Sequence, residues 1–157
     1  MGGAALAVLG SVVPACSSPP EPPAVDELEA QLTLARRDSE LATAAAVGAP
    51  QPVNAALIEA AAERTKHAQA LTTEIARLAV APASTSRETT APTTTTPAAA
   101  APPPALADVV RSLRTSADSA RQLAGTSSGY RAGLLGSIAA SCTASYTVAL
   151  AFGAASS

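Results

Sequence analysis

Apolar residues recur at steps of three and four along four stretches of the chain, the spacing of an α-helix with one buried face. These stretches cover residues 25–47, 52–78, 106–124 and 129–153. The predicted inward positions of the first two are Leu28, Leu32, Ala35, Ser39, Ala42, Ala46, Leu57, Ala61, Ala68, Leu71, Ile75 and Leu78. Those of the last two are Leu106, Val109, Val110, Leu113, Ala117, Ala120, Leu134, Ile138, Cys142, Tyr146 and Leu150.

The connections between these stretches predict how the helices are arranged. The first two are separated only by Gly48-Ala49-Pro50-Gln51-Pro52, so they form an antiparallel hairpin. Segment 81–104 consists mainly of Thr, Pro, Ser and Ala, which predicts a disordered crossover long enough to run the length of a bundle. Two antiparallel hairpins joined by one long Thr/Pro-rich crossover is the connectivity of ferritin-like proteins. We therefore predict an all-α, ferritin-like four-helix bundle over residues 25–157.

The fourth stretch differs from the others because it has no charged residue from Ala132 to the end of the chain. Small residues recur at every fourth position along one side of it, namely Gly129, Gly133, Ser137, Ser141, Ser145, Ala149 and Gly153. Small residues allow another helix to approach closely. We expect this helix to be the most buried member of the bundle, and the alternative is a membrane span.

The N-terminal residues predict where the protein resides. Residues 1–15 are apolar and uncharged and end in Val13-Pro14-Ala15, directly before Cys16. The run is too short for a membrane span and resembles the signal peptide and lipobox of bacterial lipoproteins. It lacks the usual Lys or Arg, and one explanation is a true start upstream of Met1. The alternative is an ordinary apolar N-terminus with a buried cysteine.

The lipobox resemblance implies that Cys16 is lipid-modified, with palmitate among the attached chains, and becomes the first mature residue. Residues 16–24 would then form a Pro-rich tether to the membrane. Cys142 would remain as a single buried thiol. The net charge of −2 and the absence of a basic face argue against nucleic acid as a partner.

Candidate metal ligands are confined to the second stretch, which carries Glu63, His67 and Glu74 on one flank. A di-metal ferritin-type site takes carboxylates from several helices, and the fourth stretch has neither an acid nor a histidine. We therefore predict no metal, no cofactor and no catalytic residue, with His67 paired to Glu63 at the edge of the core.

A buried ion pair is predicted instead of a metal site. Arg64 falls within the apolar stripe of the second stretch, and Asp38 lies between Leu34 and Leu41 on the first. A buried charge requires a partner of opposite sign. We therefore predict that Asp38 and Arg64 pair across the hairpin.

The segments Ala62-Glu63-Arg64-Thr65-Lys66-His67-Ala68 and Gly129–Cys142 resemble the actinobacterial ferritin-like domain of unknown function. The resemblance covers residues 25–153 apart from the crossover, and it implies a small, Ala-rich, exported bundle. We expect a non-enzymatic binding or scaffolding module, lipid-anchored on the outer face of a bacterial plasma membrane, with an unknown envelope partner. The alternatives are a ferritin-like metal-binding protein or oxidase, and a small integral membrane protein that spans with its fourth helix.

Overall fold

The computed structural model describes residues 25–80 and 102–151, which form four α-helices and one π-helical turn. The elements are α1 (Val25–Ala46), α2 (Val53–Val80), α3 (Leu106–Thr126), α4 (Gly129–Ala144) and η1 (Ser145–Ala149). The all-α prediction is confirmed for this part of the chain. The predicted signal peptide, Cys16, the tether 16–24 and residues 81–101 of the predicted crossover lie outside the described residues.

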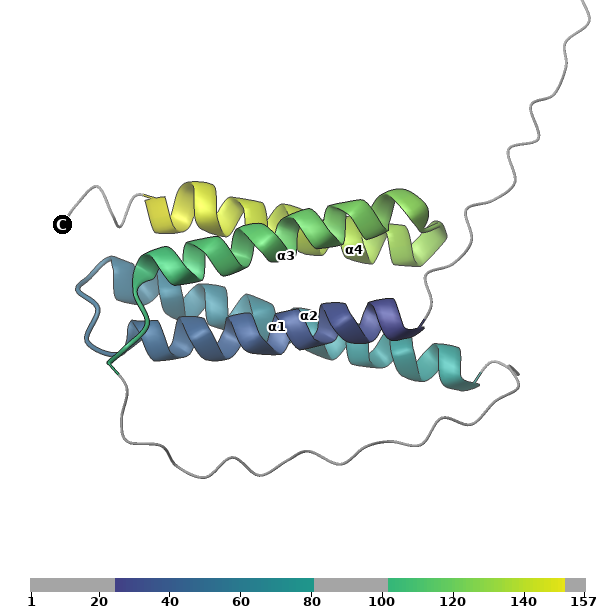
Figure 1. Cartoon of the computed structure of the whole chain (residues 1–157), viewed down its shortest axis with the longest axis horizontal. Coiled ribbons are helices and arrows are strands. Elements are labelled where there is room, and N and C mark those ends of the chain that lie inside the picture. Colours follow the sequence, from purple (N-terminus) through teal and green to yellow (C-terminus); the bar gives the residue numbers. More distant parts are fainter. Residues whose placement is uncertain (1–24, 81–101, 152–157) are drawn as a thin grey trace, which may run out of the picture.

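The helices pack as two hairpins laid against each other (Figure 1). Helix α1 packs mainly against α2 and α3 mainly against α4, while the two hairpins meet chiefly through α1 and α3. Helix α2 ends and α3 begins at opposite ends of the molecule, so these two helices run in the same direction (Figure 1). A connection between them has to cover the length of the hairpins.

The turn between α1 and α2 explains why α1 ends where it does. Gly48 adopts φ +78°, a left-handed conformation that favours glycine, two residues after Ala46, the last residue of α1. The side-chain amide of Asn54 donates a 2.7 Å hydrogen bond to the carbonyl of Ala46, one of the acceptors that the helix end leaves open. These contacts fix the end of α1 and the start of α2 in the predicted antiparallel hairpin.

Leucine and alanine share the core. Fully buried leucines such as Leu28, Leu57, Leu113 and Leu135 supply the larger apolar areas, and alanine is the most frequent buried apolar residue among those described. An alanine side chain removes far less apolar area from water than a leucine side chain. Much of the stabilisation by apolar burial is therefore expected from the few larger side chains.

The prediction that the fourth helix is the most buried member is wrong. Only 22% of the most apolar 18-residue segment within Gly129–Ala149 is buried. Helix α4 turns Leu135, Ile138, Ala139 and Cys142 toward the core and exposes its other side. The small-residue side expected to face another helix lies on that outward side, with Gly133 and Ser137 exposed. This stretch is also the one helix within the described residues that is long and apolar enough to cross a membrane.

Candidate functional site

A polar cluster lies in the middle of the otherwise apolar interior. The Asp38 carboxylate on α1 accepts hydrogen bonds from the hydroxyls of Ser112 (2.5 Å) and Ser116 (2.6 Å), both on α3. Its Oδ2 also lies 2.9 Å from Nη2 of Arg64 on α2. The structure thus brings together the predicted Asp38–Arg64 pair, and it joins three helices at this carboxylate.

The guanidinium of Arg64 also contacts His67 one helical turn further along α2. Arg64 Nη1 lies 3.2 Å from Nδ1 of His67. Because a guanidinium can only donate, Nδ1 is the acceptor and the imidazole proton resides on Nε2. Burial first, and then the charge of Arg64, lowers the pKa of His67 from 6.5 to about 4. His67 is therefore neutral at physiological pH.

The Arg64 side chain is not fully satisfied. Its contact with Asp38 is close enough for an ion pair but lacks the geometry of a hydrogen bond, and Nε has no hydrogen-bond partner within the described residues. The Arg64 side chain is only 2% exposed. Unmet donors of this kind make the remaining contacts to Asp38 and His67 costly to lose.

The prediction that His67 pairs with Glu63 is wrong. Glu63 accepts a 2.6 Å bond from Lys66 on the outer side of α2, and this hydrogen bond lowers the pKa of the Glu63 carboxyl. His67 turns inward to Arg64 instead. The physical reason is that Lys66 shares the solvent-exposed flank with Glu63, whereas the buried guanidinium needs an acceptor.

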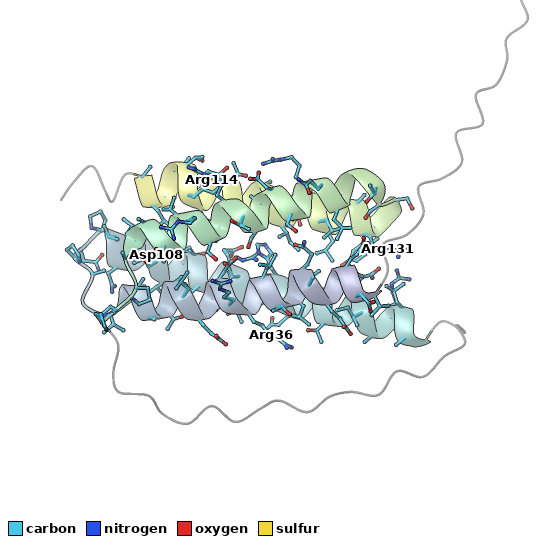
Figure 2. The ribbon with its side chains drawn as sticks, viewed as in Figure 1. Arg36, Asp108, Arg114 and Arg131 are labelled. Atoms are coloured by element: carbon cyan, nitrogen blue, oxygen red, sulfur yellow. The ribbon has the colours of Figure 1, made fainter. Side chains whose placement is uncertain are left out.

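Glu74, the third candidate metal ligand, belongs to a separate ion cluster. Its side chain is 1% exposed and receives two hydrogen bonds from Arg77, at 2.7 and 2.8 Å. Arg131, near the start of α4 (Figure 2), lies 3.6 Å from the same carboxylate. The Arg77 hydrogen bond is the main reason that the pKa of Glu74 is lowered. Glu74 therefore links the second hairpin to the first.

Helix α4 adds Cys142 to the interior. Burial raises the pKa of its thiol to about 11, and the charges of Arg64 and Asp38 also act on it. The thiol is 1% exposed and free of a disulfide. A thiol with so high a pKa is a poor nucleophile at neutral pH, because the thiolate is the reactive form.

The serines of this cluster were not predicted from the sequence. Ser112 and Ser116 are spaced i, i+4, and Ser116 immediately precedes the predicted core residue Ala117. Buried hydroxyls are hydrogen-bonded, but the spacing alone does not say whether the acceptor lies on the same helix or on a neighbouring one. Gln31 of α1, which donates a 2.6 Å bond to Ser119, continues the same row of contacts between α1 and α3.

The geometry of the cluster favours a structural role. The side chains of Asp38 and Arg64 are 0% and 2% exposed, so a substrate in solvent does not reach them. The guanidinium beside His67 repels cations, and the described residues contain no group of three His, Cys, Asp or Glu that could hold a metal ion.

No family model matches the chain, and neither the curated proteins nor the solved structures contain a match.

Proposed function

We propose that this protein is a lipid-anchored, ferritin-like helical bundle on the outer face of a bacterial plasma membrane, where it serves as a non-catalytic binding or scaffolding module. The observation that carries the proposal is that the buried charged side chains pair with one another. Asp38 and Arg64 bind each other, and Glu74 binds Arg77 and Arg131, so the buried charges join helices. Because the buried charges are occupied by one another, we expect a partner to bind the outer surface of the bundle.

Two further features support the proposal. The connectivity, with two hairpins and with α2 and α3 running in the same direction, is that expected of a ferritin-like bundle (Figure 1). The apolar residues before Cys16 and the Pro-rich residues after it have the order of a lipoprotein leader and tether.

The anchor is tested by labelling cells that express the full chain with an alkyne-tagged fatty acid. We expect label on the chain, a mature N-terminal peptide that begins at lipid-bearing Cys16, and no label on the Cys16→Ser variant. An unlabelled chain that retains residues 1–15 contradicts the lipid anchor.

A second candidate, an integral membrane protein spanning with α4, is favoured by the length and apolar character of Gly129–Ala149. It is tested by replacing residues 1–16 with an ordinary cleavable secretory leader. Release of residues 17–157 in soluble form supports the lipid anchor. Retention in the membrane fraction supports the span, since the fourth helix is the segment within residues 25–80 and 102–151 that is long and apolar enough to cross a membrane.

A further inference from the structure

A pocket between α1 and α3 contains a buried hydrogen-bond acceptor that has no donor. The pocket has a volume of ≈320 Å³. Its lining residues are Glu27, Ala30, Gln31, Ser119, Gln122, Leu123 and Thr126. Gln31 is only 3% exposed, and its Nε2 donates a 2.6 Å hydrogen bond to the hydroxyl of Ser119. The Gln31 Oε1 is also buried, and it has no hydrogen-bond partner within the described residues. Because buried polar atoms are normally hydrogen-bonded, we expect a donor from outside the described residues at this oxygen.

The charges around the pocket favour a donor that is positively charged. Glu27 lies one helical turn before Gln31 on the same side of α1, and its exposed carboxylate belongs to the pocket lining. Helix α3 ends where α1 begins (Figure 1), and the last turn of α3 carries no basic residue. The carboxyl end of a helix has a partial negative charge. No Lys or Arg belongs to the lining of this pocket, so a cation would meet no like charge there.

The remaining lining residues narrow the kind of cation. The hydroxyl of Thr126 already donates to the carbonyl of Leu123 at 3.1 Å, so its oxygen is left as an acceptor. Ala30 and Leu123 give the pocket an apolar part, against which methylene groups can pack. A single carboxylate is a poor set of ligands for a divalent metal ion, whereas an ammonium group needs only several acceptors around its N–H groups.

We propose that this pocket binds a primary alkylammonium group, either of a free amine or of a lysine side chain on a partner protein. The ammonium group donates to Oε1 of Gln31 and to the carboxylate of Glu27, and the alkyl chain lies against Ala30 and Leu123. Oε1 has almost no contact with solvent in the structure, so the exposed side chain of Gln122 has to move as the amine enters. The site adds a ligand class to the proposed binding module, and it does not depend on the lipid anchor.

The proposal is tested by adding n-butylamine at pH 7, where the amine is protonated, to the ¹⁵N-labelled full chain in detergent. We expect saturable shifts in ¹H–¹⁵N spectra at the side-chain amide of Gln31 and at the backbone amides of Ser119 and Leu123. Binding should be weak, because a ligand of few atoms has little surface to bury. This readout is the same whether or not Cys16 carries lipid, so a failed anchor does not affect it.

Three control compounds separate the chemistry of the ligand. Butanol lacks the charge, tetramethylammonium lacks N–H donors and acetate has the opposite charge, so all three should leave these signals unchanged. Shifts with acetate would show that the pocket offers donors and would overturn the proposal. An acetylated peptide with one lysine distinguishes the two sources of the amine. Tighter binding of the peptide than of n-butylamine assigns the site to a protein partner, and binding of n-butylamine alone assigns it to a free amine.

Two variants and a matched control locate the binding. Glu27→Gln and Gln31→Met should each weaken the binding of n-butylamine by roughly tenfold or more, since each removes an acceptor for the charged donor. Glu29→Gln removes another exposed carboxylate of α1 that is not part of the lining, and it should bind as the parent does. Circular dichroism checks folding, and the exposed Glu27→Gln decides the matter if Gln31→Met does not fold. The proposal is overturned by the absence of saturable shifts or by equal binding of the parent and Glu27→Gln.

Discussion

Replacing Asp38 with alanine should destabilise the fold more than any other single loss of charge among the described residues. The substitution removes the acceptor for the hydroxyls of Ser112 and Ser116, and it leaves the charge of Arg64 buried without its counter-ion. The guanidinium retains only the contact with His67, a neutral acceptor. Three helices lose their common contact at once.

The expected magnitude follows from the burial of the pair. Removing one partner of a buried ion pair costs about 3–5 kcal/mol, because the other charge stays desolvated. Domains of ordinary stability unfold with about 5–15 kcal/mol, so this loss is a large fraction of the total. We expect the midpoint of thermal unfolding to fall by roughly 10 °C or more.

The assay is thermal and urea unfolding followed by circular dichroism. Asp118→Ala is the matched control, since Asp118 also pairs with an arginine, Arg121 at 2.8 Å, but at an exposed site where such pairs contribute about 0–1 kcal/mol. The double variant Asp38→Leu/Arg64→Met should recover most of the stability, because no unpaired charge remains. If Asp38→Ala loses no more stability than Asp118→Ala, the assignment of the cluster as a structural centre is incorrect.

Three further outcomes are expected. Because the pKa of His67 is lowered to about 4 in the folded protein, the unfolded chain binds the imidazole proton more tightly. The free energy of unfolding in urea should therefore fall from pH 7 to pH 5, and it should fall less in His67→Gln. An equal decrease in the two proteins would contradict this assignment. Glu74→Ala leaves Arg131 without its partner and should cost about 1–3 kcal/mol, whereas Glu63→Ala, at an exposed pair, should cost less than about 1 kcal/mol; a reversed order in urea unfolding would refute the distinction. In Cys16→Ser, a disulfide reagent should modify Cys142 at pH 8 only as fast as the protein unfolds, so immediate labelling would show an accessible thiol.

The sequence predicts the helices and the central ion pair because both depend on simple rules. Helical periodicity located all four helices, and the need of a buried charge for a partner identified Arg64 and Asp38. The His67 contact was mispredicted because spacing along a helix does not say which of two neighbours, Glu63 or Arg64, a half-buried side chain meets.

The inward face of α4 was predicted only in part. Of the predicted inward residues Leu134, Ile138, Cys142, Tyr146 and Leu150, the structure buries Ile138, Cys142 and Leu150 and half-buries the other two. The stripe left out Leu135 and Ala139, which are also buried, because a helix that is apolar on all sides gives only a weak periodic signal to mark its buried face. The structure buries Leu135 and leaves Leu134 half-buried. Packing against α3 decides this, and a single sequence does not record it.

The polar cluster also answers a problem that an alanine-rich interior creates. Alanine side chains are so similar in shape that two helices can slide by one turn, about 5.4 Å, without a steric penalty. Asp38 meets Arg64 and both Ser112 and Ser116 in only one register, because those serines are themselves one turn apart. The buried leucines supply the larger individual apolar areas, and the ionic contact selects among helix alignments of similar apolar energy.

This division of roles predicts that stability and uniqueness separate in the double variant Asp38→Leu/Arg64→Met. We expect that variant to unfold near the parent temperature and yet to show extra or broadened amide peaks in ¹H–¹⁵N spectra, as helices exchange between registers. A single sharp set of peaks, as dispersed as that of the parent, would show that the leucines alone fix the register. The cluster would then contribute helix contacts without specifying the alignment.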